Sequence, residues 1–105
     1  MQIQINTDKN ISGDEEVSQN VEDTVRRVLG RFSDRITRIE VHLSDENSAS
    51  KSGITDKRCL LEVRLAGQQP IVVNDQAQSI EKAVTGAGQQ MVNLLETELG
   101  KRGKH

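Results

Sequence analysis

Adjacent carboxylates are the residues of this chain whose types and spacing could most directly do chemistry. Asp14, Glu15 and Glu16 form one acidic run, and Glu22 and Asp23 form a second. Two carboxylates can act as general acid and general base only where their environments move their pKa values apart. The apolar periodicity around both groups places them on the exposed face of a helix, where acidic residues near the start suit the helix dipole. We therefore expect these side chains to solvate a helix, and we expect no enzyme active site.

Histidine, cysteine and glycine offer no alternative site. His42 and His105 are far apart in the sequence, and neither has a second histidine at metal-ligand spacing. Cys59 is the single cysteine, which excludes an intramolecular disulfide, and its apolar neighbours at alternate positions indicate an inert buried thiol. Gly86 and Gly88 lie within a helical pattern and not between a strand and a helix, so they are not a phosphate loop. The sequence implies no catalytic residue, metal or cofactor.

Basic residues are the stronger candidates for a binding function. They gather between positions 26 and 38 and continue in the segments that follow: Arg26, Arg27, Arg31, Arg35, Arg38, Lys57, Arg58 and Arg64. Such a cluster could neutralise nucleic-acid phosphates across one edge of the domain. Arginines near a helix end could equally complement the helix dipole and pair with Glu22, Asp23 and Asp34. The residue types leave both interpretations open.

Composition limits how nucleic acid could be bound. The 14 basic and 16 acidic residues give a formal net charge of −2, so any attraction to a polyanion must be local. Phe32 is the one aromatic residue and belongs to an apolar helical stripe, which excludes base stacking on an aromatic platform. The 105 residues suit one domain. No apolar run approaches bilayer length and the start does not read as a signal peptide, so we expect a cytoplasmic protein.

Periodicity predicts the elements that must position these side chains. Ile3 and Ile5 alternate with polar residues, as in a strand with one buried face. Ser12 to Glu15 fits the S-x-x-E capping box and predicts a helix start. The stripe of that helix is Val17, Val21, Val25, Val28, Leu29 and Phe32.

Alternation then predicts three further strands. In the second, Thr37, Ile39, Val41 and Leu43 face inward. In the third, Cys59, Leu61, Val63 and Leu65 face inward. Ile71 to Val73 is a short fourth strand, and the polar segment 45–56 is predicted to be the most mobile internal loop. The outward strand residues would line an open face: Arg38, Glu40, His42, Arg58, Leu60, Glu62, Arg64 and Val72.

A last helix completes the predicted fold. Asp75 is expected to cap it, with Gln78 at the reciprocal position, and its apolar stripe is Ile80, Ala83, Val84, Ala87, Met91, Leu94 and Leu95. The result is an α+β domain over residues 1–99 with the order β-α-β-β-β-α. Both helices lie on one face of a four-stranded sheet, and residues 100–105 form a basic, flexible tail.

These segments resemble a known family. The opening Met1-Gln2-Ile3, the junction from Arg31 to Ile36, the strand Ile39 to Leu43 and the Asp75 start of a final helix are similar to the short ribosome hibernation-promoting factors. That ribosome-associated inhibitor family was once called the sigma-factor modulation proteins. The resemblance covers essentially the whole chain, and its motifs are diffuse.

The resemblance implies a fold similar to double-stranded-RNA-binding domains and a site in the decoding channel of the small ribosomal subunit. There the domain would block messenger and transfer RNA, holding ribosomal RNA phosphates with lysines and arginines of its helices and loops. Lys82, Lys101, Arg102 and Lys104 join the arginine cluster as candidate contacts. The chain departs from the family in the last helix, where Gly86, Gln89, Gln90 and Asn93 replace basic residues. The alternative is a module that binds a protein, including a second copy of itself, through the open sheet face.

Overall fold

The computed structural model describes residues 1–8, 15–45 and 57–103, with side chains up to residue 100. Its elements follow one another as β1 (Gln2–Thr7), α1 (Glu15–Leu29), the short 3-10 helix η1 (Gly30–Phe32), β2 (Ile36–Asp45), β3 (Lys57–Leu65), β4 (Ile71–Ala77) and α2 (Ile80–Gly103). This is the predicted order of helices and strands.

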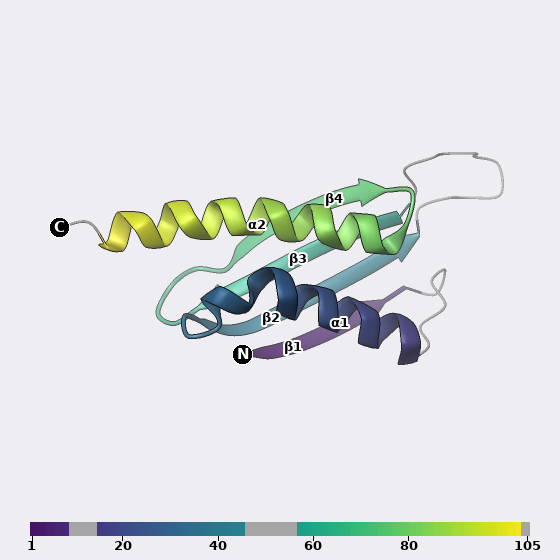
Figure 1. Cartoon of the computed structure of the whole chain (residues 1–105), viewed down its shortest axis with the longest axis horizontal. Helices are drawn as coiled ribbons and strands as arrows, with labels where there is room; N and C mark the ends of the chain where they lie inside the picture. The colour runs from purple at the N-terminus through teal and green to yellow at the C-terminus, as the bar shows by residue number, and fades with distance from the viewer. Residues whose placement is uncertain (9–14, 46–56, 104–105) are drawn as a thin grey trace.

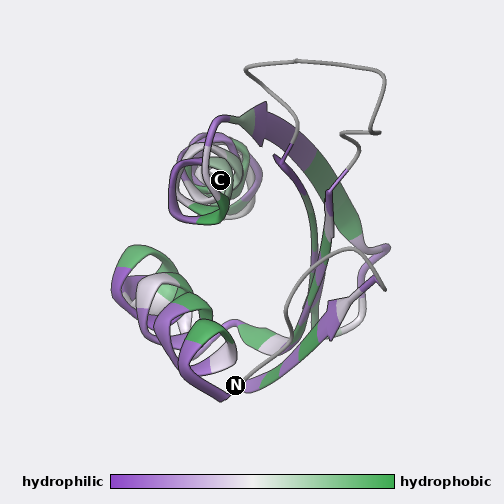
Figure 2. Cartoon of the chain, turned by 90° about the vertical axis from the view of Figure 1, so that its right-hand side faces the viewer, coloured by the Kyte–Doolittle hydropathy of each residue, from purple (hydrophilic) through white to green (hydrophobic). Residues whose placement is uncertain are grey.

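The four strands form one mixed sheet in the order β1-β2-β3-β4. β1 and β2 are parallel and are joined through α1, while β2, β3 and β4 pair antiparallel. Figure 1 shows α1 and α2 lying in front of the sheet. Seen from the end in Figure 2, the sheet is curved and both helices lie on its concave side. The predicted α+β architecture is confirmed.

The core fills the space between the two helices and the concave face. The predicted inward residues of β3 are all buried, and so are the helical residues Val21, Val25, Leu29, Val84, Met91 and Leu95. The convex face carries the alternate residues of each strand, which are polar in most positions. One apolar layer therefore holds the whole fold together.

The prediction for the start of β2 was wrong by one position. Ile36 is buried and Thr37 is exposed, and the pairing with β3 shifts between Ile36 and Arg38. Such a shift is a β-bulge, in which one extra residue interrupts the alternation. The Thr37 hydroxyl donates a hydrogen bond of 3.1 Å to the carbonyl oxygen of Arg64 on β3. A strict period of two cannot anticipate the extra residue.

The predicted cap of the last helix was also wrong. β4 continues through Ala77, and Asp75 pairs with Cys59 inside the sheet. Helix α2 is instead capped by Ser79, whose Oγ accepts a hydrogen bond of 3.2 Å from the backbone N–H of Lys82. An aspartate side chain can cap a helix, but pairing with β3 keeps the backbone of Asp75 in the strand.

Four other predictions concern one core residue of α2 and the ends of segments. Leu94 was assigned to the buried stripe of α2, yet it is 44% exposed and Val92 is buried instead. The helical backbone continues to Gly103, so the boundary expected at residue 99 falls inside α2. The capping box at Ser12 lies outside the described residues, as does the loop expected at 45–56 apart from Asp45, the last residue of β2.

Two glycines let α2 approach its neighbours closely. A Cβ at position 86 would overlap the Asp75 carboxylate of β4, with Cγ only 2.8 Å away. A Cβ at position 88 would lie 3.0 Å from Cγ1 of Val28 in α1. These contacts explain why α2 tolerates residues that cost about 1 kcal/mol each in a helix relative to alanine.

We predict that truncating either buried leucine destabilises the fold strongly. Leu29→Ala and Leu95→Ala each remove a fully buried side chain and should lower the free energy of unfolding by about 2 to 5 kcal/mol. Leu94→Ala is the control in the same helix and should cost well under half as much. Urea denaturation measures all three, and equal losses at positions 94 and 95 would contradict the assigned helix face.

We also predict opposite effects for two glycines of α2. Gly86→Ala forces the Asp75 carboxylate to move and should destabilise the protein, whereas a Cβ at Gly100 meets nothing within 4 Å. Gly100→Ala should therefore raise helix stability by up to about 1 kcal/mol. Thermal denaturation of both variants tests this. A stabilised Gly86→Ala would show that the close approach is not a constraint.

Candidate nucleic-acid interface

The structure divides the candidate basic residues between the two sides of the sheet. Arg26 and Arg27 lie in α1, Arg31 in η1 and Lys82 in the first turn of α2, so these four belong to the helix side. Arg38, Arg58 and Arg64 lie at outward positions of β2 and β3, on the convex face. Arg35 is exposed in the turn between η1 and β2. The single basic patch considered from the sequence is therefore two separate groups.

Three of the four remaining candidates are at the ends of elements. Lys57 begins β3, and its Nζ lies 3.1 Å from Oδ2 of Asp45 at the end of β2. The backbone of Lys101 and Arg102 continues helix α2, and Lys104 lies outside the described residues.

Two helix-side arginines are held by carboxylates. A terminal guanidinium nitrogen of Arg26 lies 3.0 Å from Oε2 of Glu22, one turn earlier in α1. Arg31 lies 2.6 Å from Glu96 of α2, and its guanidinium stands 4.8 Å from the centroid of the Phe32 ring. Because Arg31 and Glu96 are on different helices, their pair ties η1 to α2. Sequence spacing could not identify Glu96 as this partner.

Two other helix-side cations and Arg35 in the turn before β2 have no such partner among the described residues. Within the described part of the chain, Arg27, Arg35 and Lys82 form no ion pair, and Arg27 and Lys82 are exposed. A phosphate approaching these residues displaces no carboxylate from them. They are the basic side chains best placed to bind an anionic partner.

A groove of about 420 Å³ runs between the two helices. Val17, Val21, Ile80 and Val84 supply its apolar lining. Its polar residues are Arg27 with Asn20, Thr24, Asp23 and Glu81, so the groove presents mixed charge and not a uniformly basic surface.

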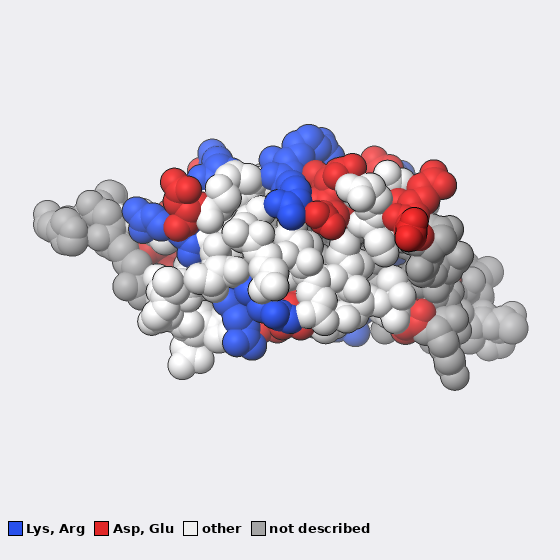
Figure 3. Space-filling model, turned by 90° about the horizontal axis from the view of Figure 1, so that it is seen from below, with Lys and Arg blue, Asp and Glu red and all other residues white. Residues whose placement is uncertain are grey.

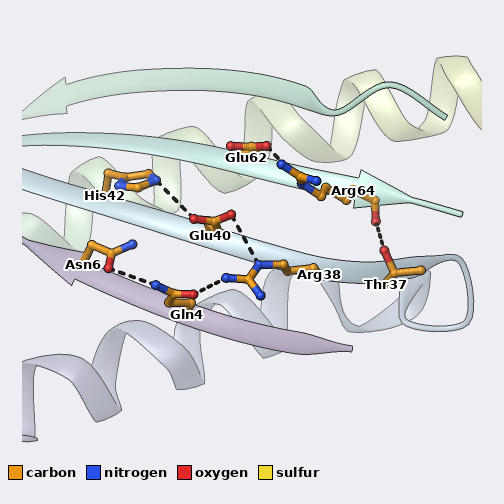
Figure 4. A network of polar contacts seen from close by, with 8 residues as sticks. All are labelled: Gln4, Asn6, Thr37, Arg38, Glu40, His42, Glu62 and Arg64. Carbon is orange, nitrogen blue, oxygen red and sulfur yellow. Dashed lines mark hydrogen bonds and ion pairs between the residues drawn. The ribbon is translucent and has the colours of Figure 1, made fainter.

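The convex face carries a connected polar network (Figure 4). Arg38 donates from Nε to Glu40 Oε2 over 3.3 Å and from a terminal nitrogen to Gln4 Oε1. His42 Nε2 lies 3.8 Å from Glu40 Oε1. Gln4 in turn donates to Asn6, over 3.2 Å.

A separate pair lies on the neighbouring strand, where Arg64 Nε donates to Glu62 Oε2 over 3.2 Å. Arg38 and Arg64 are thus each paired with the glutamate two residues away on the same strand. The roles of Gln4 and Asn6 were not predicted, although their alternation with Ile3 and Ile5 placed them on this face.

Figure 3 shows how the charges are distributed on one side of the molecule. Basic and acidic side chains are interspersed along one margin, and a second group of basic side chains, with acidic ones beside it, lies at the opposite margin. A band of uncharged surface separates them. Neither margin is a continuous basic stripe, which agrees with the net charge of −2.

Cys59 and Asp75 face each other across β3 and β4 on the helix side of the sheet. Burial raises the pKa of the Cys59 thiol from 9.0 to about 12, and the nearby Asp75 carboxylate adds to the shift. Gln90 of α2 bonds to the β4 side of this pair, donating to Asn74 O over 3.0 Å and to Asp75 Oδ1 over 3.4 Å. Cys59 is thus a buried thiol that is protonated at neutral pH, which agrees with the inert thiol expected from its apolar neighbours.

No group of three or more histidine, cysteine, aspartate or glutamate side chains in 1–8, 15–45 and 57–100 is placed to hold a metal ion. No helix in the described part of the chain combines the length and apolar character needed to span a membrane.

Comparisons with known proteins identify the family. The family model described as sigma 54 modulation protein / S30EA ribosomal protein matches residues 4–102. The chain therefore belongs to this family of ribosome-associated proteins, and the resemblance seen in the sequence is confirmed. A comparison with curated protein sequences found no match.

Solved structures show the same fold at low sequence identity. A ribosomal subunit interface protein from Coxiella burnetii is similar with a TM-score of 0.75 and 16% identity, covering 95% of this chain and 99% of that one. The N-terminal domain of Protein Y from Thermus thermophilus is similar with a TM-score of 0.71 and 20% identity, covering 92% and 98%.

We predict that Cys59 makes stability fall at alkaline pH. Its pKa is raised in the folded state, so above about pH 9 the unfolded chain loses the thiol proton while the folded chain keeps it. The raised pKa of Cys59 contributes its full amount to the free energy of unfolding below pH 9. This contribution declines as the pH rises toward 12, by up to about 1.4 kcal/mol per pH unit. Unfolding free energies of the parent and Cys59→Ala should converge over this range. A constant difference would contradict the raised pKa.

Proposed function

We propose that this protein is a non-enzymatic, cytoplasmic translation inhibitor that binds the small ribosomal subunit and occludes its messenger and transfer RNA channel. Membership of the sigma 54 modulation protein / S30EA ribosomal protein family supports ribosome association. The observation that favours one surface is a set of exposed cations without ion-pair partners in the described residues: Arg27 and Lys82 on the helix side, and Arg35 in the turn before β2.

Electrostatics favours the helix side over the convex face for contact with RNA. Arg38 and Arg64 already bond to Glu40 and Glu62, so a phosphate must compete with a carboxylate that is linked to the same strand. Arg27 and Arg35 meet no such competitor among the described residues. Phosphate binding by these side chains releases counterions from the RNA, which is favourable at low ionic strength.

We expect few contacts between basic side chains of this protein and RNA phosphates. Exposed α2 positions beyond Lys82 include the uncharged Gln89, Gln90 and Asn93, and the acidic residues Asp23 and Glu81 line the groove beside Arg27. Affinity would then depend on individual arginines, and should be weaker than that of a relative with a lysine-rich last helix.

Binding to purified small ribosomal subunits tests the proposal. We predict that the affinity of the parent falls steeply with salt, and that Arg27→Ala/Arg35→Ala lowers the slope of log affinity against log salt by about one per lost phosphate contact. The matched control Arg38→Ala/Arg64→Ala removes two arginines from the convex face and should keep the parental slope. Co-sedimentation over a salt series measures all three proteins, and a translation assay tests occlusion of the channel.

Two results would overturn this assignment. Absence of subunit binding at low salt would exclude ribosome association as the function of this chain. Binding that weakens in the Arg38/Arg64 variant but not in the Arg27/Arg35 variant would assign the ribosome contact to the convex face.

A further inference from the structure

The charges of the convex face are arranged in rows that run across the strands. The pairing of β2 with β3 places Arg38 directly opposite Arg64 and Glu40 directly opposite Glu62. A row of two positive charges therefore lies beside a row of two negative charges. Two residues along a strand separate the rows, which is about 7 Å.

Within one molecule, this arrangement places like charges next to each other. Like charges directly opposite each other across two strands are unfavourable, and this face has two such pairs. Bonds along each strand offset them, at 3.3 Å for Arg38 with Glu40 and 3.2 Å for Arg64 with Glu62. Arg38 also bonds to Gln4, and His42 lies beside Glu40. A surface that places a negative row over the arginines and a positive row over the glutamates would complement the face.

The face itself is such a surface. We propose that this chain forms a reversible, symmetric dimer in which the convex faces of two copies meet. The arginine row of each copy lies against the glutamate row of the other. Arg38 then lies against Glu40 of the partner subunit, and Arg64 lies against Glu62 of the partner subunit. A two-fold contact uses each of these pairs twice.

The charges also select one orientation. A two-fold axis across the strands, between the two rows, reverses the strand direction and places each arginine row over a glutamate row. A two-fold axis along the strands would place arginine over arginine and glutamate over glutamate. The dimer therefore has the β2 and β3 strands of its two copies running nearly antiparallel, within the angle of about 30° usual for packed sheets.

Shape limits the strength of this dimer. The outer surface is convex (Figure 2), so two copies meet mainly along the central strands β2 and β3, which carry all four charges. The four-stranded face offers roughly 300 to 400 Å² per copy, less than half of the ~800 Å² in a standard stable interface. The dimer should thus be weak, and its affinity should be sensitive to salt.

The flanking residues add apolar contact. Leu60 is partly buried beside His42, and Val72 is 51% exposed beside Glu62. The inference goes beyond the proposed function, because it uses the opposite face and does not require ribosome binding.

Complementary charge reversals test the dimer. Arg38→Glu/Arg64→Glu makes the four central positions acidic, and Glu40→Arg/Glu62→Arg makes them basic. Sedimentation equilibrium of the parent at low salt should show a mass that rises with concentration, and roughly tenfold more salt should weaken the association about tenfold or more. Each variant alone should remain monomeric, and an equimolar mixture should form a heterodimer.

Controls keep the result specific to the face. Glu15→Arg/Glu16→Arg makes the same change in net charge as the basic variant but lies in α1, on the other side of the sheet, and should associate like the parent. Far-UV circular dichroism checks that each variant is folded. If the reversals unfold, Arg38→Gln/Arg64→Gln and Glu40→Gln/Glu62→Gln remove the charges more gently, and each should weaken association.

The proposal fails if the folded parent is monomeric at millimolar concentration and low salt. It also fails if the parent associates but the reversal variants associate equally well, or if mixing the two folded variants gives no heterodimer. Recovery of association only in the mixture supports both the partner and the orientation.

Discussion

Burial of one apolar layer between the two helices and the concave face of the sheet is the constraint on which this structure depends. Each strand supplies that layer with alternate residues, so the intervening residues must face outward. Both helices need the same apolar layer, and neither is available to cover the convex face. The position of a residue in a strand therefore decides its surface, which is why Arg38 is separated from Arg26 and Arg27 despite its closeness to them in the sequence.

Local pairing, more than net charge, then decides what each cation can do. Arg31 is held by Glu96 of another element and by the ring of Phe32, so it contributes to joining η1 with α2. Arg38 bonds to Glu40 and Gln4, and Arg64 bonds to Glu62. Arg27 belongs to neither arrangement in the described structure. A polyanion would distinguish these arginines even though their residue type and exposure are similar.

The sequence predicted the element order, the family and most core residues, because alternation and helical periodicity directly express one-sided burial. It failed where one interaction overrode a local pattern. The bulge moved Thr37 outward, and continued pairing with Cys59 kept Asp75 in β4 and left the cap of α2 to Ser79. It also assigned Leu94 to the core in place of Val92. The division of the basic residues could not be predicted from their spacing, since it depends on how the elements pack.

The bulge at Thr37 connects these observations. Ile36 and Ile39 are both buried although they are three positions apart, which strict alternation would not allow. The extra residue lets Ile36 join the core while Arg38 and Glu40 remain on the convex face opposite Arg64 and Glu62. If the bulge were absent and Arg38 and Glu40 kept their partners on β3, Ile36 would face solvent beside the arginine row. The irregular pairing at Thr37 therefore allows both the burial of Ile36 and the charge rows of the convex face.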